Sequence, residues 1–451
     1  MSLLTEAAPA LEALAAANRK LAAQYPGERT ARQPIHTVYG GAQLYKAETT
    51  RRLGELARAS FETFAPTPQD LAEGVGLSPA LRADAALTEL VYQRVKAKLQ
   101  REAVEDFRID FEDGFGARSD AEEDETAVRA GGELARAMRD GALPPFIGIR
   151  IKSFGEEWAR RGARTLELFV DALLAESGGV LPDNFVITLP KVMIPEQPRT
   201  LVRLLELLEA RHGLAAGSLR FELMIETTQA LIGPDGYCPL PALLAACAGR
   251  CVGAHLGTYD FTASCNITAA YQTMDHPMCD LAKGLMVLSF AGTGLFLSDG
   301  ATNVMPVPPH RGKELSPAQL AENRAVVHAA WRLSHRHIRH SLEGGYYQGW
   351  DLHPGQLPVR YAACYGFFLE GLKSAAERLE NFIARAAQAT LVGDVFDDAA
   401  TGQGLLNYFL RALNCGAIDL SDIARTGLTP AEVELRSFAK ILAARRARLG
   451  G

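Results

Sequence analysis

Eight short runs rich in β-branched and aromatic residues recur along the chain, each separated from the next by a stretch of helical length. The runs occupy residues 35–41, 106–113, 146–154, 185–192, 220–227, 252–261, 294–307 and 349–356. Apolar residues in the intervening stretches recur at three- and four-residue spacing, which is typical of amphipathic helices. From the second run to the sixth, equivalent positions recur about every 35 to 40 residues. This spacing indicates strand–helix units, which form a parallel sheet.

Eight such units favour an α/β fold of the closed (β/α)8 TIM barrel type over an open doubly wound sheet. The continuous apolar runs "FVITL" and "FIGIRI" are typical of strands covered on both sides. The longer gaps after the first run and before the last predict insertions, and the pattern becomes helical after residue 370. We therefore expect an N-terminal helical segment (1–34), a catalytic TIM barrel (35–370) and a C-terminal helical extension or lid (371–451).

Composition narrows the choice of partner and compartment. The chain has 451 residues, a formal net charge of -6 and 48% hydrophobic residues, which suits a globular protein without a basic surface for nucleic acid. The longest nearly apolar run (284–297) is too short to span a bilayer. The seven cysteines form an odd count without a Cys-x-x-Cys pair, so we expect reduced thiols and a cytoplasmic protein.

Charged or titratable residues stand at the predicted carboxyl ends of successive strands. They are Asp110, Glu112, Asp113, Arg150, Lys152, Lys191, Glu226, Asp260, Asp299 and His353. A single carboxylate after a strand is ordinarily a helix N-cap or a surface group. The chemistry of a TIM barrel, however, lies where these strand ends converge, so their coincidence favours a functional site.

Several carboxylates that face one opening repel each other unless a cation offsets them. Arg150 and a divalent metal would supply that offset. With only oxygen ligands and no nearby His-x-x-His or Cys pair, the expected metal is Mg²⁺, or Mn²⁺ as a substitute, rather than zinc. A 2-keto acid can chelate such a metal, which then stabilises the enolate common to aldol cleavage and decarboxylation.

Six short motifs follow these strands in order. They are "DFED" (110–113), "RIK" (150–152), "PK" (190–191), "IET" (225–227), "GTYDF" (257–261) and "HPGQ" (353–356). In this order and spacing the chain resembles the citrate lyase beta subunit and HpcH/HpaI aldolase superfamily. That superfamily belongs to the wider phosphoenolpyruvate and pyruvate barrels, which include malate synthase and malyl-CoA lyase. The resemblance covers residues 35 to about 360.

The resemblance implies roles for five of these residues. Glu226 and Asp260 would be the direct metal ligands. Arg150 would bind the substrate carboxylate and stabilise the enolate oxygen, because its planar fork suits a carboxylate. Glu112 and Asp113 would lie near the metal and hold its waters.

Four further positions carry weaker expectations. Lys191 is interpreted as a structural salt bridge. His353 is interpreted as a buried hydrogen-bonding residue, and its position in the family also allows a substrate contact. Lys152 replaces the Asn that relatives usually have after the strand-three Arg, and it is a candidate to bind substrate. Asp419, in "LNCGAIDLSDIA", matches an acid–base Asp that malyl-CoA lyase relatives carry on a C-terminal lid, often from a neighbouring subunit; an N-cap role is favoured over this one.

The sequence thus predicts a Mg²⁺-dependent carbon–carbon lyase or aldolase that acts on a 2-keto or 3-hydroxy acid, with a CoA thioester left open. We expect a small-molecule substrate, no nucleic-acid or membrane partner, and a homo-oligomer. Two alternatives remain open. One is a Schiff-base aldolase that uses Lys191. The other is a non-catalytic barrel that binds a metabolite.

Overall fold

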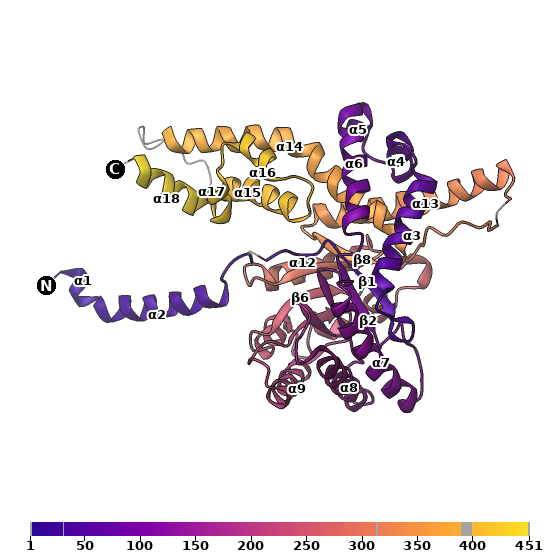
Figure 1. Cartoon of the computed structure of the whole chain (residues 1–451). Coiled ribbons are helices and arrows are strands. Elements are labelled where there is room, and N and C mark those ends of the chain that lie inside the picture. Colours follow the sequence, from indigo (N-terminus) through magenta and orange to yellow (C-terminus); the bar gives the residue numbers. More distant parts are fainter. Residues whose placement is uncertain (1, 30, 313, 389–398, 450–451) are drawn as a thin grey trace.

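The computed structural model describes residues 2–29, 31–312, 314–388 and 399–449. Within these ranges eight parallel strands close into a barrel in sequence order (Figure 1). The strands are β1 (His36–Gly41), β2 (Asp106–Asp110), β3 (Phe146–Arg150), β4 (Phe185–Leu189), β5 (Arg220–Ile225), β6 (Cys251–Leu256), β7 (Phe296–Ala301) and β8 (Gln348–Asp351). Strand β1 pairs with both β2 and β8, which closes the barrel. The predicted (β/α)8 fold is confirmed.

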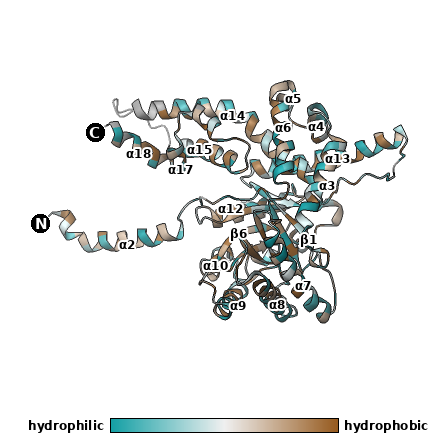
Figure 2. Ribbon diagram, in the orientation of Figure 1, coloured by the Kyte–Doolittle hydropathy of each residue, from teal (hydrophilic) through white to brown (hydrophobic). Residues whose placement is uncertain are grey.

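Helices connect the strands and cover the outside of the barrel. After β2 these are α7 (Asp120–Arg139), α8 (Ala159–Ser177), α9 (Glu196–His212), α10 (Leu240–Ala246), α11 (Thr258–Ser264), α12 (Pro277–Phe290) and α13 (Pro317–Glu343). Short 3₁₀ turns are η1 (Ala42–Leu44), η2 (Thr228–Ala230), η3 (Ala269–Tyr271), η4 (Pro354–Gln356) and η5 (Ala424–Thr426). Figure 2 shows hydrophobic residues concentrated in the strands that these helices cover.

The predicted insertion after the first strand is helical. It consists of α3 (Thr49–Phe64), α4 (Pro68–Val75), α5 (Pro79–Ala83) and α6 (Ala85–Arg101). Helix α6 packs against α14 (Leu357–Gln388), the first helix after the barrel. Helix α14 continues through residue 370, where the sequence analysis placed a domain boundary.

Further helices complete the two ends of the chain. The predicted C-terminal helical region is present and comprises α14, α15 (Ala399–Asn414), α16 (Leu420–Ile423), α17 (Pro430–Glu434) and α18 (Phe438–Leu449). At the other end, α1 (Leu3–Glu6) and α2 (Ala8–Gln24) project from the barrel and contain no buried residue (Figure 1). None of the described helices combines the length and apolar character needed to cross a membrane.

The interior of the barrel contains a buried layer of charge. Arg108 of β2 donates from Nε and Nη2 to the two carboxylate oxygens of Glu222 on β5, at 3.0 and 3.1 Å. The same guanidinium contacts Asp106, and Glu222 also pairs with His255 Nε2 at 2.9 Å. Arg108 and Glu222 are 2% and 4% exposed, so each charge depends on its partners to offset the cost of leaving water.

This layer predicts a large loss of stability in Glu222→Gln. The substitution keeps the shape of the side chain but removes the charge that Arg108 and His255 face. The free energy of unfolding in urea should fall by about 3 to 5 kcal/mol. Glu206→Gln is the matched control, because Glu206 forms an exposed pair with Arg203, and it should cost less than about 1 kcal/mol. Equal losses in the two variants would contradict the interpretation.

Candidate functional site at the carboxyl end of the barrel

A cavity of about 370 Å³, here called the upper cavity, opens at the carboxyl ends of the strands. It is lined by Tyr39, Gly41, Asp110, Asp113, Gly114, Arg150, Glu226, Gly257, Thr258, Tyr259, Asp260, Ala301, Trp350 and Leu352. These residues come from β1, β2, β3, β7 and β8 and from the segments that follow β2, β5, β6 and β8. The structure therefore brings together Arg150, Asp113, Glu226 and Asp260, four of the residues that the sequence singled out.

Arg150 is fixed by Asp110, its neighbour across the β2–β3 pair. Its Nε and Nη2 donate to the two oxygens of Asp110 at 2.7 and 2.5 Å. Burial alone lowers the pKa of Arg150, but Asp110 raises it well above its ordinary value. Asp110 also accepts hydrogen bonds from the backbone N–H groups of Glu112 and Gly114, at 2.9 and 2.8 Å. One carboxylate thus positions both the guanidinium and the loop after β2.

Lys191 lies at the centre of the acidic cluster, by which we mean Glu112, Asp113, Glu226 and Asp260. Its Nζ is 2.5 Å from Glu112, 3.1 Å from Asp260 and 3.4 Å from Asp113. Its backbone N–H donates to Glu226 Oε1 at 2.7 Å, and its φ of 52° places it in the left-handed region. Burial lowers the pKa of the Lys191 amine, but Glu226 and Glu112 raise it above its ordinary value.

Glu226 is a buried carboxyl group with incomplete charge compensation. It is 2% exposed, and burial is the main reason that its pKa rises to about 8. Lys191 opposes this rise, whereas Asp260 adds to it. A Cβ atom on Gly257 would lie 2.4 Å from Glu226 Oε2, so only glycine leaves room for this carboxyl group. Asp260, in the first turn of α11, has a side chain that is 41% exposed.

Glu226 and Asp260 together suit a hard divalent cation. Both border the upper cavity and both offer oxygen, the donor that Mg²⁺ prefers. Burial raises the pKa of Glu226 more than Lys191 lowers it, so a further cation beside it would stabilise the carboxylate form. In the described ranges no group of three or more His, Cys, Asp or Glu side chains is placed to hold a metal. The protein would therefore supply two ligands, and water or substrate the others.

Four predicted site residues do not line this cavity, and one of them is Glu112, whose contact with Lys191 is described above. Lys152 Nζ donates to Phe111 O at 3.1 Å and pairs with Glu123 at 3.4 Å. His353 caps η4, with Nδ1 accepting from the Gly355 N–H. Asp419 caps α16, in agreement with the favoured reading of the sequence. Roles of these residues in substrate binding or acid–base catalysis stay predictions.

Tyr39 is a site residue that the sequence analysis missed. Its hydroxyl is buried, and no hydrogen-bond partner for it lies within the described part of the chain. Its ring lies 5.0 Å from the Arg150 guanidinium carbon and 4.8 Å from the Trp350 ring. Thr258 Oγ1 is likewise buried without a partner among the described residues. The one signal for Tyr39 in the sequence was its position near the end of the first strand. The sequence analysis singled out charged and titratable strand-end residues, and so passed over an uncharged tyrosine.

Comparisons with known proteins add a family and a set of similar folds. A family model described as "Domain of unknown function (DUF6986)" matches residues 14–441, and no curated protein matches the chain. Among solved structures, the Haloferax volcanii malate synthase lead(II) complex is 14% identical, with a TM-score of 0.45 over 92% of this chain and 98% of that one. The magnesium/glyoxylate complex of the same enzyme is 13% identical, with a TM-score of 0.42 over 85% and 99% of the chains.

The unpartnered Tyr39 hydroxyl predicts that Tyr39→Phe costs little stability. Because the hydroxyl donates to no group among the described residues, its removal should change the free energy of unfolding by less than about 0.5 kcal/mol, or raise it. Tyr361→Phe is the control, since its hydroxyl donates to Ala103 O at 3.0 Å, and it should cost about 1 kcal/mol. Urea unfolding of the two variants measures the difference. An equal cost would mean that the Tyr39 hydroxyl has a protein partner.

Proposed function

This chain belongs to the DUF6986 family, and we propose that it is a Mg²⁺-dependent carbon–carbon lyase or aldolase that acts on a 2-keto or 3-hydroxy acid. The observation that carries the proposal is the convergence of Glu226, Asp260 and Arg150 on the upper cavity. Two carboxylates for a hard cation and one fixed guanidinium for a carboxylate are the groups that enolate chemistry on a small acid requires. A CoA thioester would have to place most of its length outside this cavity.

Glu226 and Asp260 would hold the metal, which when bound supplies Lewis-acid stabilisation of an enolate. In the structure Asp260 is paired with Lys191 at 3.1 Å. Metal binding therefore requires Lys191 Nζ to move away from Asp260, while its contact with Glu112 can remain. The loop residues Glu112 and Asp113 lie beside the same site and would orient water molecules there.

Arg150 would bind the carboxylate of the substrate. Its Nε and Nη2 are used by Asp110, whereas Nη1 lies at the looser distances of 3.3 Å from Glu112 and 3.4 Å from Asp113. Nη1 is therefore the nitrogen that can donate to a substrate while Nε and Nη2 keep the pair with Asp110. Because that pair fixes the guanidinium beforehand, little reorganisation is needed when the substrate binds.

The surroundings of Lys191 weigh against the Schiff-base alternative. Attack on a carbonyl requires a neutral amine, and so a lowered pKa. Here carboxylates of the acidic cluster surround the amine and raise its pKa. We therefore interpret Lys191 as the cation that holds the acidic cluster together.

The proposal predicts that Glu226→Gln and Asp260→Asn each abolish Mg²⁺ binding while the fold stays intact. Both changes preserve the size of the side chain and remove one anionic ligand. Isothermal titration calorimetry measures Mg²⁺ affinity, and circular dichroism checks the fold. Asp183→Asn and Glu206→Gln, which change exposed carboxylates, are the matched controls. Both variants should bind Mg²⁺ with the affinity of the unaltered chain. Normal Mg²⁺ affinity in either site variant would overturn the assignment.

An activity screen tests the same proposal. Keto acids, 3-hydroxy acids and their CoA thioesters would be assayed for release of pyruvate, glyoxylate or acetyl-CoA. Activity should disappear in EDTA and return with Mg²⁺. Turnover that persists in EDTA would contradict the metal-dependent mechanism, and saturable binding without turnover on the whole panel would favour the non-catalytic alternative.

Lys191→Met separates the two enzymatic alternatives. If Lys191 competes with the metal for Asp260, its removal should tighten Mg²⁺ binding by about tenfold, because a nearby positive charge is lost. Calorimetry measures this change. With the unaltered chain, borohydride and pyruvate should leave no covalent adduct detectable by mass spectrometry. An adduct at Lys191, or weaker Mg²⁺ binding in the variant, would contradict the interpretation.

A further inference from the structure

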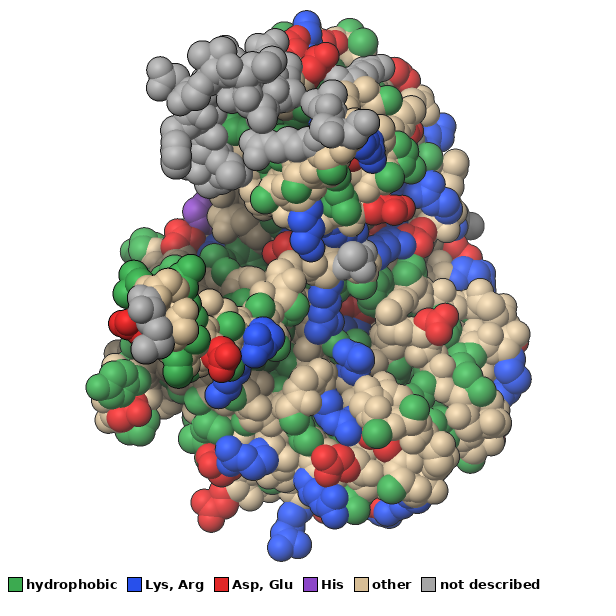
Figure 3. Space-filling model, turned by 90° about the vertical axis from the view of Figure 1, so that its left-hand side faces the viewer, with side chains coloured by type: hydrophobic (Ala, Val, Ile, Leu, Met, Phe, Trp, Pro, Cys, Tyr) green, Lys and Arg blue, Asp and Glu red, His purple; other side chains and the backbone are tan. Residues whose placement is uncertain are grey.

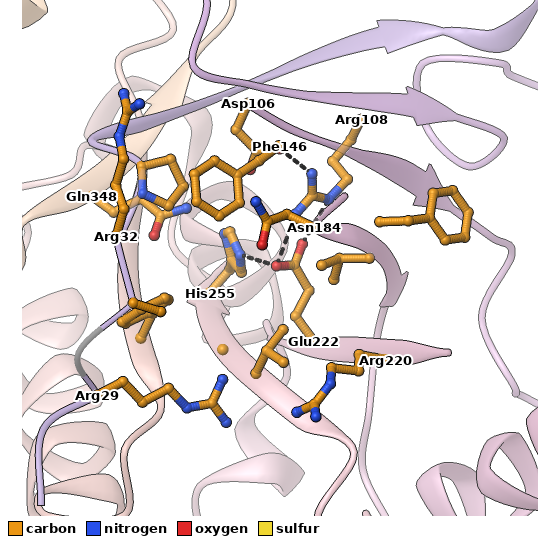
Figure 4. Close-up of a pocket in the computed structure, with 17 residues that line it drawn as sticks. Arg29, Arg32, Asp106, Arg108, Phe146, Asn184, Arg220, Glu222, His255 and Gln348 are labelled. Atoms are coloured by element: carbon orange, nitrogen blue, oxygen red, sulfur yellow. Dashed lines mark hydrogen bonds and ion pairs between the residues drawn. The ribbon is translucent and has the colours of Figure 1, made fainter. Parts of the chain in front are cut away.

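A second cavity, here called the lower cavity, lies at the amino ends of the strands, opposite the upper cavity. Its volume is about 270 Å³. Its wall includes residues at the amino ends of β2 to β8 and part of the segment that leads from α2 to β1. Figure 3 shows Lys and Arg side chains gathered along the middle of the face from which α1 and α2 project. Four arginines, Arg29, Arg32, Arg108 and Arg220, line the lower cavity (Figure 4).

Two of these arginines have carboxylate partners. Arg32 pairs with Glu102 and Glu105, at 2.5 and 2.7 Å. Arg108 belongs to the buried layer described above and pairs with Glu222. Carboxylates of the protein already offset the charges of Arg32 and Arg108. These two arginines therefore line the lower cavity but need no anionic ligand.

Arg29 and Arg220 are different. No carboxylate of the described ranges pairs with either of them. Within the described residues the Arg29 side chain makes one hydrogen bond, from Nη2 to Cys251 O at 3.2 Å, and its guanidinium lies 5.9 Å from the centre of the Phe296 ring. Figure 4 shows the guanidinium groups of Arg29 and Arg220 turned toward each other across the cavity. Two like charges face each other, an arrangement that an anion between them would stabilise.

The electrostatics of Arg29 agree with this geometry. Burial is the main cause that lowers its pKa, and the charge of Arg220 is the second. Gly294, with φ of 81°, lies beside the Arg29 side chain, and a Cβ atom there would be 3.3 Å from Arg29 Cγ. The chain thus places Arg29 in a confined position where its charge is not neutralised.

Apart from the four arginines and the polar residues Asp106, Asn184, Glu222, His255 and Gln348, the wall of the lower cavity is apolar. Phe146, Phe185, Val252 and Phe296 contribute to it. Such a wall suits a compact hydrocarbon or aromatic group. Guanidinium groups bind carboxylates and phosphates through paired hydrogen bonds. We infer that the lower cavity is a binding site for a small organic anion, with a carboxylate or phosphate held between Arg29 and Arg220 and an apolar body against the phenylalanines.

The inference is tested by calorimetric titration of the full chain with three probes: benzoate, phenyl phosphate and inorganic phosphate. At least one of the two aromatic probes should bind saturably and more tightly than inorganic phosphate, because only the aromatic probes use the apolar wall. Preference for benzoate or for phenyl phosphate then identifies the anionic group. Binding should weaken as sodium chloride is added.

Arg29→Gln and Arg220→Gln should each weaken this binding by about tenfold, since each removes one charged donor. Loss of binding in the double variant is expected. Arg203→Gln, on the exposed side of α9, is the matched control and should leave affinity unchanged. Arg220 is itself exposed, so its variant should fold, and a thermal melt checks this. Failure of both aromatic probes to bind, or equal affinity in the unaltered chain and both single variants, would overturn the inference.

Discussion

The pair between Arg150 and Asp110 connects the residues of the candidate site at the carboxyl end of the barrel. Adjacent strands place the two residues side by side, and both oxygens of Asp110 contact the guanidinium. The same oxygens hold the backbone of the loop after β2, which brings Glu112 to Lys191. Lys191 in turn contacts Asp260 through its amine and Glu226 through its backbone. The candidate metal ligands are thus joined to the first ion pair by a continuous set of contacts.

A second charged layer lies deeper in the barrel and is connected to the upper cavity. Glu222 pairs with His255 Nε2, and His255 Nδ1 accepts from Trp350 Nε1 at 2.8 Å. Trp350 lines the upper cavity, whereas Glu222 and His255 line the lower cavity. Buried ion pairs contribute little net stability relative to apolar packing, but breaking one is costly. The polar interior therefore restricts which side chains the barrel can accept.

The sequence predicted the fold, and the meeting of several candidate residues at one cavity, because both depend on periodicity. Repeated strand–helix units predict a barrel, and a barrel brings the strand ends together, so Glu226, Asp260 and Arg150 could be expected to meet. Lys152 is a residue whose position this periodicity does not predict. Two residues after Arg150, it would point the same way in a continued strand, but β3 ends at Arg150 and the alternation stops there.

Other features depend on tertiary structure that periodicity does not encode. The left-handed backbone of Lys191, which points its N–H at Glu226, is one example. The unpartnered hydroxyl of Tyr39 is another, because only the surrounding packing buries it. Arg29 lies outside any strand, in the segment before β1, so no strand-end pattern singled it out.

The two ends of the barrel carry opposite surpluses of charge. At the upper cavity the carboxylates of Asp110, Glu112, Asp113, Glu226 and Asp260 face two cations, Arg150 and Lys191, within the described residues. This imbalance is one reason that burial can raise the pKa of Glu226 to about 8. At the lower cavity, no carboxylate among the described residues pairs with Arg29 or Arg220, and the two carboxylates that line it, Asp106 and Glu222, are paired with Arg108. Because uncompensated charge is costly near a protein interior, the upper cavity favours a cation and the lower cavity an anion.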